Sequence, residues 1–268
     1  MSVEAGAVGL ISGSGTAAWP GLDGRAETVP TRWGDVEVTV GDLGGVAVAH
    51  ISRHGAGHRR LSNHVAHRAN IAALADLRVG CVVSQTVCGS LDPDAALGSL
   101  VVFDDLHFPS NRLPDGSLCT FHDQAGGAGR GHWIFDGPFS EQLRDLLVGG
   151  ARAAGVPVVD GGCYGHVDGP RFNTRSEIAA LRAVGVTAVS QTAAPEAVLA
   201  GEAGLPFALV GYLTDHANGV SSATEPVEAL LARVAASTTA FATAIGAALP
   251  AIRDAELAPA GVRHTFEP

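Results

Sequence analysis

The sequence predicts an α/β fold: a single domain over residues 1–268 with a central mixed sheet flanked by helices. Short β-branched runs alternate with longer segments of helical periodicity along the chain. Hydrophobic residues make up 46% of the 268 residues, which is enough apolar material for a substantial core. No linker of distinct composition divides the chain, so one domain is expected.

The first half of the chain predicts five strands, two of them paired as a hairpin, and one helix. The run Ala7–Ile11 is a strand that enters the glycine-rich turn SGSGT, and residues 36–52 form a hairpin whose arms flank Gly41–Gly45. Residues His64–Leu77 have helical spacing. Residues 80–90 predict a buried strand, and residues 99–107 predict another.

The second half alternates more regularly between helix and strand. Helices are expected from the cap Ser140 to Gly155 and over residues 174–185, 194–204 and 225–249. Thr174 and Glu177 have the spacing of a capping box. Strands are expected over residues 156–169, 186–192 and 206–215, which separate these helices.

Composition argues against several classes of protein. The formal net charge is −10, with 17 Lys and Arg against 27 Asp and Glu, whereas a protein that binds nucleic acid needs a broad basic surface. No basic segment followed by a long apolar core opens the chain. The apolar run Val227–Leu249 is interrupted by charged and hydroxyl residues and predicts a docked helix, so we expect a cytoplasmic protein with no membrane partner.

The four cysteines predict buried free thiols in a reducing compartment. Cys81, Cys88, Cys119 and Cys163 form no C-x-x-C pair and have no histidine at a zinc-binding spacing. No metal site is therefore expected.

Polar and glycine-rich motifs follow several predicted strands. They include GSGT (13–16), RHGAGH (53–58), SQTVCGSL (84–91), SQTAAPE (190–196) and YLTDHANG (212–219). Each motif alone fits a turn or a solvated loop as well as a binding site. Ligands of open α/β sheets bind beyond the carboxyl ends of strands, so the set together suggests a site for a small anion. Phe172 and Asn173 lie between a Gly-Pro turn and a capped helix, and they fit either a core-and-turn role or ligand binding.

Taken in order, these motifs resemble the trimeric purine nucleoside phosphorylase family, and most closely its methylthioadenosine phosphorylase branch. The resemblance extends from about Val8 to the last helix and includes GPRFNTRSE and TAAPEAVLAGEAGLP. It implies the nucleoside phosphorylase fold and the reversible attack of phosphate on a purine nucleoside, which yields free base and pentose 1-phosphate. Inorganic phosphate is then a co-substrate, and no metal or organic cofactor is implied.

The resemblance also assigns roles to individual residues. Phosphate would be bound by Ser14, Arg53, His54, Thr86, the backbone N–H of Val87, and Thr192. The nucleoside would contact Phe172, Asn173, Gln191, Asp215, His58 and, from a neighbouring subunit, His132. Arg53, His54 and Asp215 would serve catalysis, with Asp215 supplying or bridging a proton at N7 of the departing base. Glu196 would order the structure near the site. A homotrimer, or a hexamer built as a dimer of trimers, is implied.

Two positions depart from the family pattern. Gln191 stands where the family has a methionine under the ribose hydroxyls, and Ala217 stands where the adenine-selective branch has a second acid. The carboxylate of Asp215 favours a 6-aminopurine, so a 5′-deoxy-5′-methylthio nucleoside of that base is the expected substrate. Alternatives are a 6-oxopurine nucleoside or methylthioinosine phosphorylase, a phosphate-independent nucleosidase, and a non-catalytic nucleoside-binding protein on the same fold.

Overall fold

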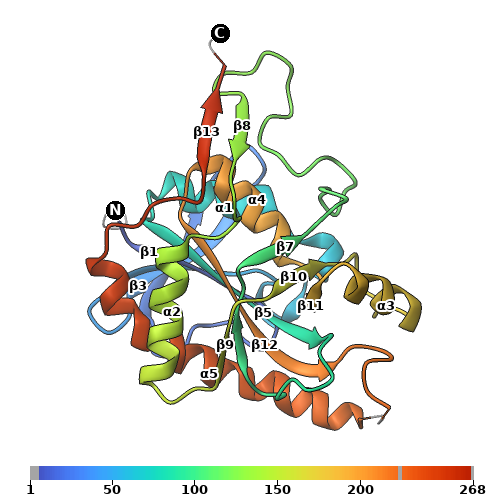
Figure 1. The fold of residues 1–268 in the computed structure, drawn as a ribbon. Helices are drawn as coiled ribbons and strands as arrows, with labels where there is room; N and C mark the ends of the chain where they lie inside the picture. Colours follow the sequence, from blue (N-terminus) through green and yellow to red (C-terminus); the bar gives the residue numbers. More distant parts are fainter. Residues whose placement is uncertain (1–5, 223–224, 267–268) are drawn as a thin grey trace.

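Strand β5 (Cys81–Ser90) is the centre of the sheet in the computed structural model, which describes residues 6–222 and 225–266 (Figure 1). In these residues the main sheet has 11 strands. From one edge its path runs β2 (Asp23–Val29), β3 (Val36–Asp42), β4 (Ala47–Ser52), β1 (Val8–Ser12), β5, β11 (Val186–Ser190), β10 (Cys163–His166) and β7 (Asp105–His107). A branch leaves β5 through β12 (Phe207–His216), β6 (Leu100–Val102) and β9 (Val158–Asp160).

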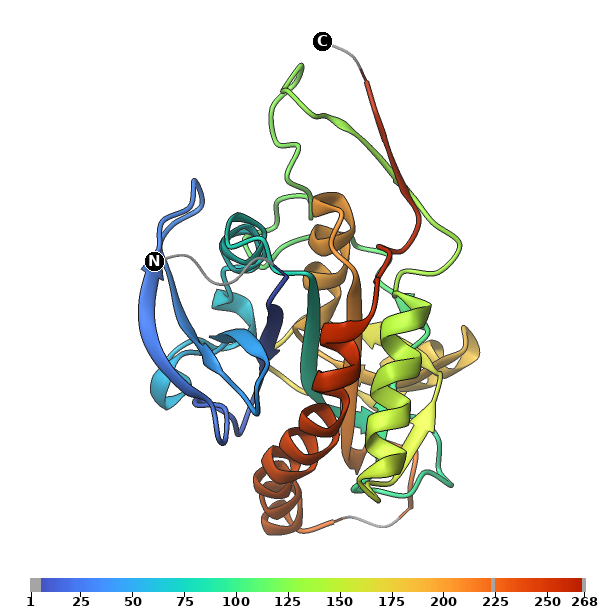
Figure 2. The ribbon, with the colours of Figure 1, turned by 90° about the vertical axis from the view of Figure 1, so that its left-hand side faces the viewer.

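Helices cover both faces of this sheet (Figure 2). One face carries α2 (Glu141–Ala153) and α5 (Val227–Asp254), and the other carries α1 (His67–Asp76) and α4 (Ala193–Ala203). A fifth helix, α3 (Arg175–Ala183), packs beside β11. Each face has its own apolar core, so the expected mixed sheet flanked by helices is confirmed.

The long helix α5 has the length and hydropathy that a membrane-crossing helix requires. In the fold, however, Phe241, Ile245 and Leu249 are buried in the core that α5 shares with α2 and the sheet. Helix α5 continues through Pro250 to Asp254, beyond the expected end at Leu249.

Several local predictions differ from the structure. Residues 156–169, expected as one strand, form two strands, β9 and β10, because Gly161 and Gly162 turn the chain between them with positive φ angles of 96° and 136°. Residues 99–107 form two short strands, β6 and β7, because Asp104 turns the chain between them and its carboxylate accepts a hydrogen bond from the Gly162 backbone N–H at 2.8 Å. Strand β2 was not expected. A separate two-stranded sheet of β8 (Gly131–Ile134) and β13 (Val262–Thr265) was not expected either, and it forms an arm that stands away from the body of the protein (Figures 1 and 2).

The main sheet opens along the middle of β5. Strand β1 pairs with Cys81–Ser84 of β5, whereas β11 pairs only with Gly89 and Ser90. Residues 85–88 therefore have β12 on one side and no strand on the other. Backbone groups on that open edge are available to side chains and ligands, as polar backbone groups near a core require partners.

Substitution of two adjacent glycines in α2, Gly149 and Gly150, can test how closely α2 packs against α5. Gly150 faces α5 so closely that an added Cβ would lie 2.7 Å from the Cβ of Ala248, whereas a Cβ on Gly149 would meet nothing within 4 Å. Gly150→Ala is expected to lower the free energy of unfolding by about 1–3 kcal/mol through overpacking. Gly149→Ala, the matched control, should raise it by about 0.5–1 kcal/mol because alanine favours a helix. Urea denaturation measures both, and equal effects would contradict the packing described.

Candidate active site

A pocket of about 400 Å³ lies where the sheet opens along β5. Most of the residues that the sequence nominated line its wall: Ser14, His54, His58, Thr86, Val87, Phe172, Asn173, Gln191, Thr192 and Asp215. The chain thus brings together side chains from β5, β12, the loop after β4, the loop before α3 and the start of α4. Arg53 and His132 are not part of the wall.

Arg53 lies beneath the pocket in a fully buried ion pair with Glu196 of α4. Its Nε and Nη2 donate to the two carboxylate oxygens of Glu196, the latter at 2.8 Å. Nη2 also donates to Ser84 Oγ, and Nη1 donates to the backbone oxygen of Gln85 at 3.1 Å. The arginine therefore joins the end of β4 to β5 and α4, across the opening in the sheet.

This geometry bears on the expected role of Arg53 in phosphate binding. Four hydrogen bonds use four of the five guanidinium N–H donors, which leaves one on Nη1. The side chain is 0% exposed, so it does not present a planar fork to the pocket. Direct contact with phosphate stays a prediction. The structure shows a different task, which is to neutralise Glu196 and hold three elements together.

The Glu196 carboxylate has an unusually low pKa for a buried acid. Burial acts to raise the pKa, but the charge and hydrogen bonds of Arg53 outweigh it and lower the pKa to about 2. His67 of α1 lies 3.7 Å from the same carboxylate. Burial, together with the nearby Arg53 charge, lowers the pKa of His67, so the ion pair remains arginine with carboxylate at neutral pH.

His54 enters the pocket as a neutral imidazole. Burial and the adjacent Arg53 charge lower its pKa to about 4. Its Nδ1 lies 2.8 Å from the backbone oxygen of Arg60, and because a carbonyl only accepts, Nδ1 carries the proton. Nε2 is then a bare acceptor, suited to the hydroxyl of a protonated phosphate. His58 stacks on the ring with centroids 4.1 Å apart.

The turn after β1 that carries Ser14 is held from two sides. Ser12 Oγ donates to the Thr16 backbone oxygen at 2.6 Å, so His50 Nε2 must be the donor in its 2.7 Å contact with Ser12 Oγ. Thr238 of α5 donates to the backbone oxygen of Gly15. Gly15 has φ +88°, and a Cβ there would approach the Val234 oxygen to 3.0 Å, so the turn requires glycine at this point.

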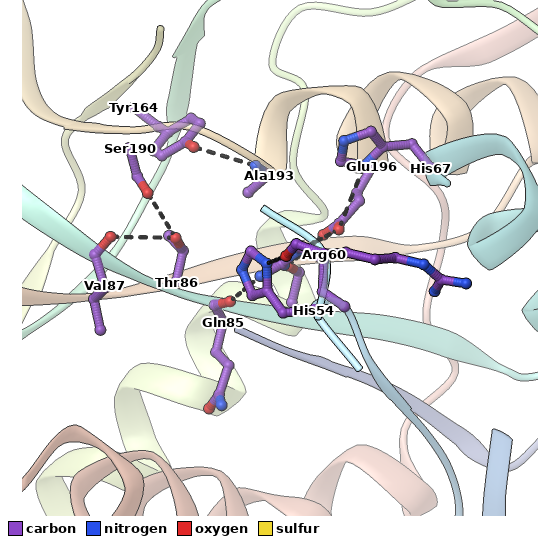
Figure 3. A network of polar contacts seen from close by, with 12 residues as sticks. His54, Arg60, His67, Gln85, Thr86, Val87, Tyr164, Ser190, Ala193 and Glu196 are labelled. Carbon is purple, nitrogen blue, oxygen red and sulfur yellow. Dashed lines mark hydrogen bonds and ion pairs between the residues drawn. The ribbon is translucent and has the colours of Figure 1, made fainter. Parts of the chain in front are cut away.

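Hydroxyl and backbone donors gather at the open edge of β5 (Figure 3). Thr86 Oγ1 lies 2.9 Å from Ser190 Oγ, and their side chains point toward each other. The Gln85 backbone oxygen faces Arg53 on the open edge. Because alternate residues of a strand turn their backbone groups to the same edge, the N–H of Val87 faces that edge too.

Helix α4 adds its amino terminus to the same region. Thr192 is its N-cap residue and lines the pocket without a side-chain capping bond, so its hydroxyl is not committed to the helix. The N–H of Ala193 donates to the buried Tyr164 hydroxyl at 3.2 Å. The first turn of a helix attracts anions through its unpaired N–H groups and the helix dipole.

A bulge in β12 presents Asp215 to the pocket beside Gly89, three residues along β5 from Thr86. The pairing register with β5 shifts between Leu213 and Asp215, and such bulges redirect the following side chain. Burial raises the pKa of Asp215, Thr214 opposes this by donating to Oδ1 at 2.7 Å, and the charge of Glu225 raises it further. Asp215 is thus a carboxyl group that holds a proton more readily than an ordinary aspartate.

The loop before α3 is hydrogen-bonded to α3 on one side and to the segment after β12 on the other. Phe172 is 62% exposed and lines the pocket, so it is not a core residue. Asn173 donates to Glu177 at 3.3 Å, and Asn218 donates to the Asn173 backbone oxygen at 2.6 Å. The capping box of Thr174 and Glu177, which the sequence predicts, is confirmed.

Several wall residues escaped sequence reasoning. They are Leu61, Ser62, Val167, Ile178, Val189, Leu230, Leu231 and Val234. Gly89, Pro170, Ser190, Thr214, Ala217 and Asn218 also line the wall, and they lie within the motifs quoted above. The apolar members carry the same periodicity as core residues, so nothing in the sequence marks them. Ser190 opens the second SQT motif, and the repetition of that motif was a usable signal.

His132 lies on the arm formed by β8 and β13, outside the pocket of its own chain. Its side chain is exposed, and its ring packs edge-on against Phe266 with centroids 5.5 Å apart. The predicted contribution of His132 to a neighbouring subunit stays a prediction.

The four cysteines are free thiols, of which Cys81, Cys88 and Cys119 are buried and Cys163 is half-buried. Within residues 6–222 and 225–266, no three or more His, Cys, Asp or Glu side chains are grouped to hold a metal ion.

Hydroxyl groups, the amino terminus of α4 and the carboxyl group of Asp215 line one pocket of this mixed sheet, an arrangement that suits a pentosyltransferase of the phosphorylase type. The chain belongs to the phosphorylase superfamily, whose family profile matches residues 7–249.

Characterised relatives divide between two kinds of purine substrate. A 6-oxopurine nucleoside phosphorylase from Pyrococcus furiosus is 34% identical over 218 residues, covering 80% of this chain and 81% of the relative. An S-methyl-5′-thioadenosine phosphorylase from Mycolicibacterium smegmatis is 38% identical over 216 residues, covering 80% and 78%. The crystal structure of methylthioadenosine phosphorylase from Schistosoma mansoni with adenine superposes with a TM-score of 0.85 at 28% identity, covering 93% of this chain and 92% of that one.

Removing the Glu196 charge should destabilise the protein strongly. Glu196→Gln leaves Arg53 buried without a counter-charge, and the free energy of unfolding at pH 7 is expected to fall by about 3–5 kcal/mol. The folded pKa of Glu196, about 2, lies below its ordinary 4.5, so the stabilisation is complete above pH 4.5 and is lost as the pH falls toward 2. The difference in the free energy of unfolding between the wild type and Glu196→Gln should therefore become smaller as the pH falls.

Urea denaturation at pH 7 and at successively lower pH measures this difference. The control is Glu256→Gln, the same change at an exposed position, which should alter stability by less than about 0.5 kcal/mol. A Glu196→Gln protein as stable as this control at pH 7 would show that the ion pair does not hold the fold.

Proposed function

We propose that this protein catalyses the phosphorolysis of a purine nucleoside, with a 5′-deoxy-5′-methylthio nucleoside of a 6-aminopurine as the preferred substrate. The proposal rests on one observation: a single pocket holds two different kinds of polar group. Ser14, Thr86 and Thr192 offer hydroxyls, and Asp215 offers a protonatable carboxyl group. The similarity to purine nucleoside phosphorylases of both base preferences supports the reaction class.

In the proposed reaction, phosphate occupies the end of the pocket near the start of α4. The hydroxyls of Ser14, Thr86 and Thr192, together with the Val87 N–H, donate to its oxygens, and His54 Nε2 accepts from its remaining proton. Arg53 is paired with Glu196 and holds β5 against α4, which is the role that its contacts support.

The chemical step forms a bond between a phosphate oxygen and C1′ as the glycosidic C–N bond breaks. The electron pair of that bond moves onto the purine ring, and the developing charge at N7 takes the proton of Asp215. A carboxyl group with a raised pKa suits this proton transfer because it remains protonated at higher pH than an ordinary aspartate. Bound phosphate also stabilises the cationic sugar through its negative charge.

The sugar 5′ group would meet the first turns of α5. Leu230, Leu231 and Val234 line the pocket there and offer no hydrogen-bonding side chain, so an apolar thioether fits better than a hydroxyl. For the base, Asp215 favours an exocyclic amino donor, and Phe172 offers an aromatic face. Because the pKa of Asp215 is raised, the protonated form can also donate to a 6-oxo group, which keeps a 6-oxopurine nucleoside or methylthioinosine as the second candidate.

Turnover should depend on inorganic phosphate. We expect release of adenine from methylthioadenosine only when phosphate is present, with higher kcat/KM for methylthioadenosine than for methylthioinosine, adenosine or inosine.

Thr86→Val should raise the KM for phosphate by about 10–100-fold, because one hydrogen bond to a charged group is lost, about 1.5–3 kcal/mol. Thr187→Val, on the exposed face of β11, is the matched control and should leave KM unchanged.

Each alternative has its own outcome in this assay. Equal turnover without phosphate identifies a nucleosidase, and nucleoside binding without turnover identifies a binding protein. A preference for inosine-type substrates would reverse the base assignment.

Arg53→Ala is a poor probe of phosphate binding, because it would leave Glu196 buried and unpaired.

We further propose that residues 1–268 act as one domain in a cytoplasmic homotrimer, or in a hexamer of two trimers. The arm carries exposed Ile134 and Val262, 55% and 65% exposed, beside the exposed His132. Contact with a second copy would cover these apolar side chains and bring His132 to a neighbouring pocket.

Light scattering at micromolar concentration is expected to give three or six times the mass of one 27.1 kDa chain. Ile134→Asp should shift the protein toward monomer, whereas Val159→Asp, at a 48% exposed valine on β9, should not. A wild-type monomer would contradict the assembly.

A further inference from the structure

Gln191 lies at the junction of β11 and α4, and both ends of its side-chain amide are already bonded within the protein. Ser62 Oγ donates to Oε1 at 3.0 Å. Nε2 donates to the backbone oxygen of Arg171 at 3.0 Å. The orientation of the amide is unambiguous, because a backbone oxygen only accepts and must face the nitrogen.

These two bonds join segments that are far apart in the sequence. Ser62 follows the RHGAGH motif after β4, whereas Arg171 belongs to the loop that carries Phe172 and Asn173. The contact is tight: a Cβ on Gly169 would lie 2.0 Å from Gln191 Oε1 and 2.3 Å from Ser62 Oγ. The loop before α3 therefore packs directly against the Gln191 amide, with no room for a side chain at Gly169.

This arrangement differs from the expected contact between Gln191 and the ribose. Oε1 keeps only one further lone pair and Nε2 one further proton for a ligand, and both atoms are fixed by their protein partners. Any contact of the sugar with Gln191 would therefore be additional to the hydrogen bonds that Gln191 makes with Ser62 and Arg171.

We propose that Gln191 is a positioning residue: it latches the Gly169–Asn173 loop to Ser62 and thereby sets Phe172 and Asn173 over the nucleoside end of the pocket. The inference rests on the proposed function for the identity of the ligand, but the latch itself is independent of any reaction. It predicts that the residue controls nucleoside binding through the loop, while phosphate binding changes little, because the hydrogen bonds of the Gln191 side chain go to Ser62 and Arg171 and not to the proposed phosphate donors.

The chemistry of the latch requires an amide at this position. One side chain must accept from Ser62 and donate to Arg171 at once, which glutamine does and methionine and glutamate do not. Methionine has similar length without either polar atom. Glutamate retains the acceptor but places negative charge against a backbone oxygen.

The first arm of the test is hydrogen–deuterium exchange of the peptide covering residues 167–174, measured without any ligand. Gln191→Met, Gln191→Glu and Ser62→Ala should each raise its exchange rate, by about 10-fold for the two Gln191 variants. Gln124→Met, at an exposed glutamine outside the pocket, is the matched control. Melting temperatures establish that each variant is folded.

The second arm separates a positioning role from a general loss of structure. The KM for nucleoside should rise by about 5–20-fold in Gln191→Met, while the KM for phosphate changes less than about 2-fold. Ser62→Ala combined with Gln191→Met should be no worse than Gln191→Met alone, since both changes break one latch.

Unchanged exchange in Gln191→Met would overturn the latch, whatever the activity. Faster exchange with an unchanged KM for nucleoside, or with an equal rise in both KM values, would overturn the positioning role. If the wild type turns over no nucleoside, the proposed function fails, and the exchange arm still decides the latch.

Discussion

The pocket depends on a single constraint, which is the buried ion pair between Arg53 and Glu196 at the point where the sheet opens. Strands β1 and β11 pair with opposite ends of β5 and leave its middle without a neighbour on one side. A sheet edge in a protein interior needs other partners for its backbone groups. Arg53 bonds the Gln85 oxygen and Ser84 at this edge and is itself compensated by Glu196. Neither charge would be tolerated in the core alone, so strand, loop and helix are interdependent.

Arg53 and His54 of the RHGAGH motif are buried, whereas His58 at its end is exposed. In an acidic protein, Arg53 points into the interior and His54 is held neutral at the pocket wall. The pocket wall near Thr86 and Thr192 offers dipoles: hydroxyls, the open edge of β5 and the amino terminus of α4. Such preorganised dipoles need no reorganisation when charge develops, and they do not bind anions as indiscriminately as an exposed lysine cluster.

The part of the wall that carries Phe172 and Asn173 is assembled differently, from loops that are bonded to one another. Phe172 is exposed and owes its position to its loop, which Gln191 and Asn218 tie to the rest of the wall. Asp215 owes its direction to a bulge in β12. Relatives of similar identity are named for different purines, in keeping with a pocket wall in which Phe172 and Asn173 lie on a loop.

The sequence by itself determined the alternation of strands and helices, the capping box at Thr174 and the group of motifs that meets in the pocket, because these depend on local periodicity, cap chemistry and strand ends. Only the tertiary structure decided the branch of the sheet at β5 and the pairing of β8 with β13, since segments 128 residues apart at Ile134 and Val262 carry no local sign of their contact. It also decided that Arg53 faces Glu196 and that Gln191 faces Ser62 and Arg171. A side chain's chemistry is readable from its type, but its partner is set by which distant backbone the fold places within reach.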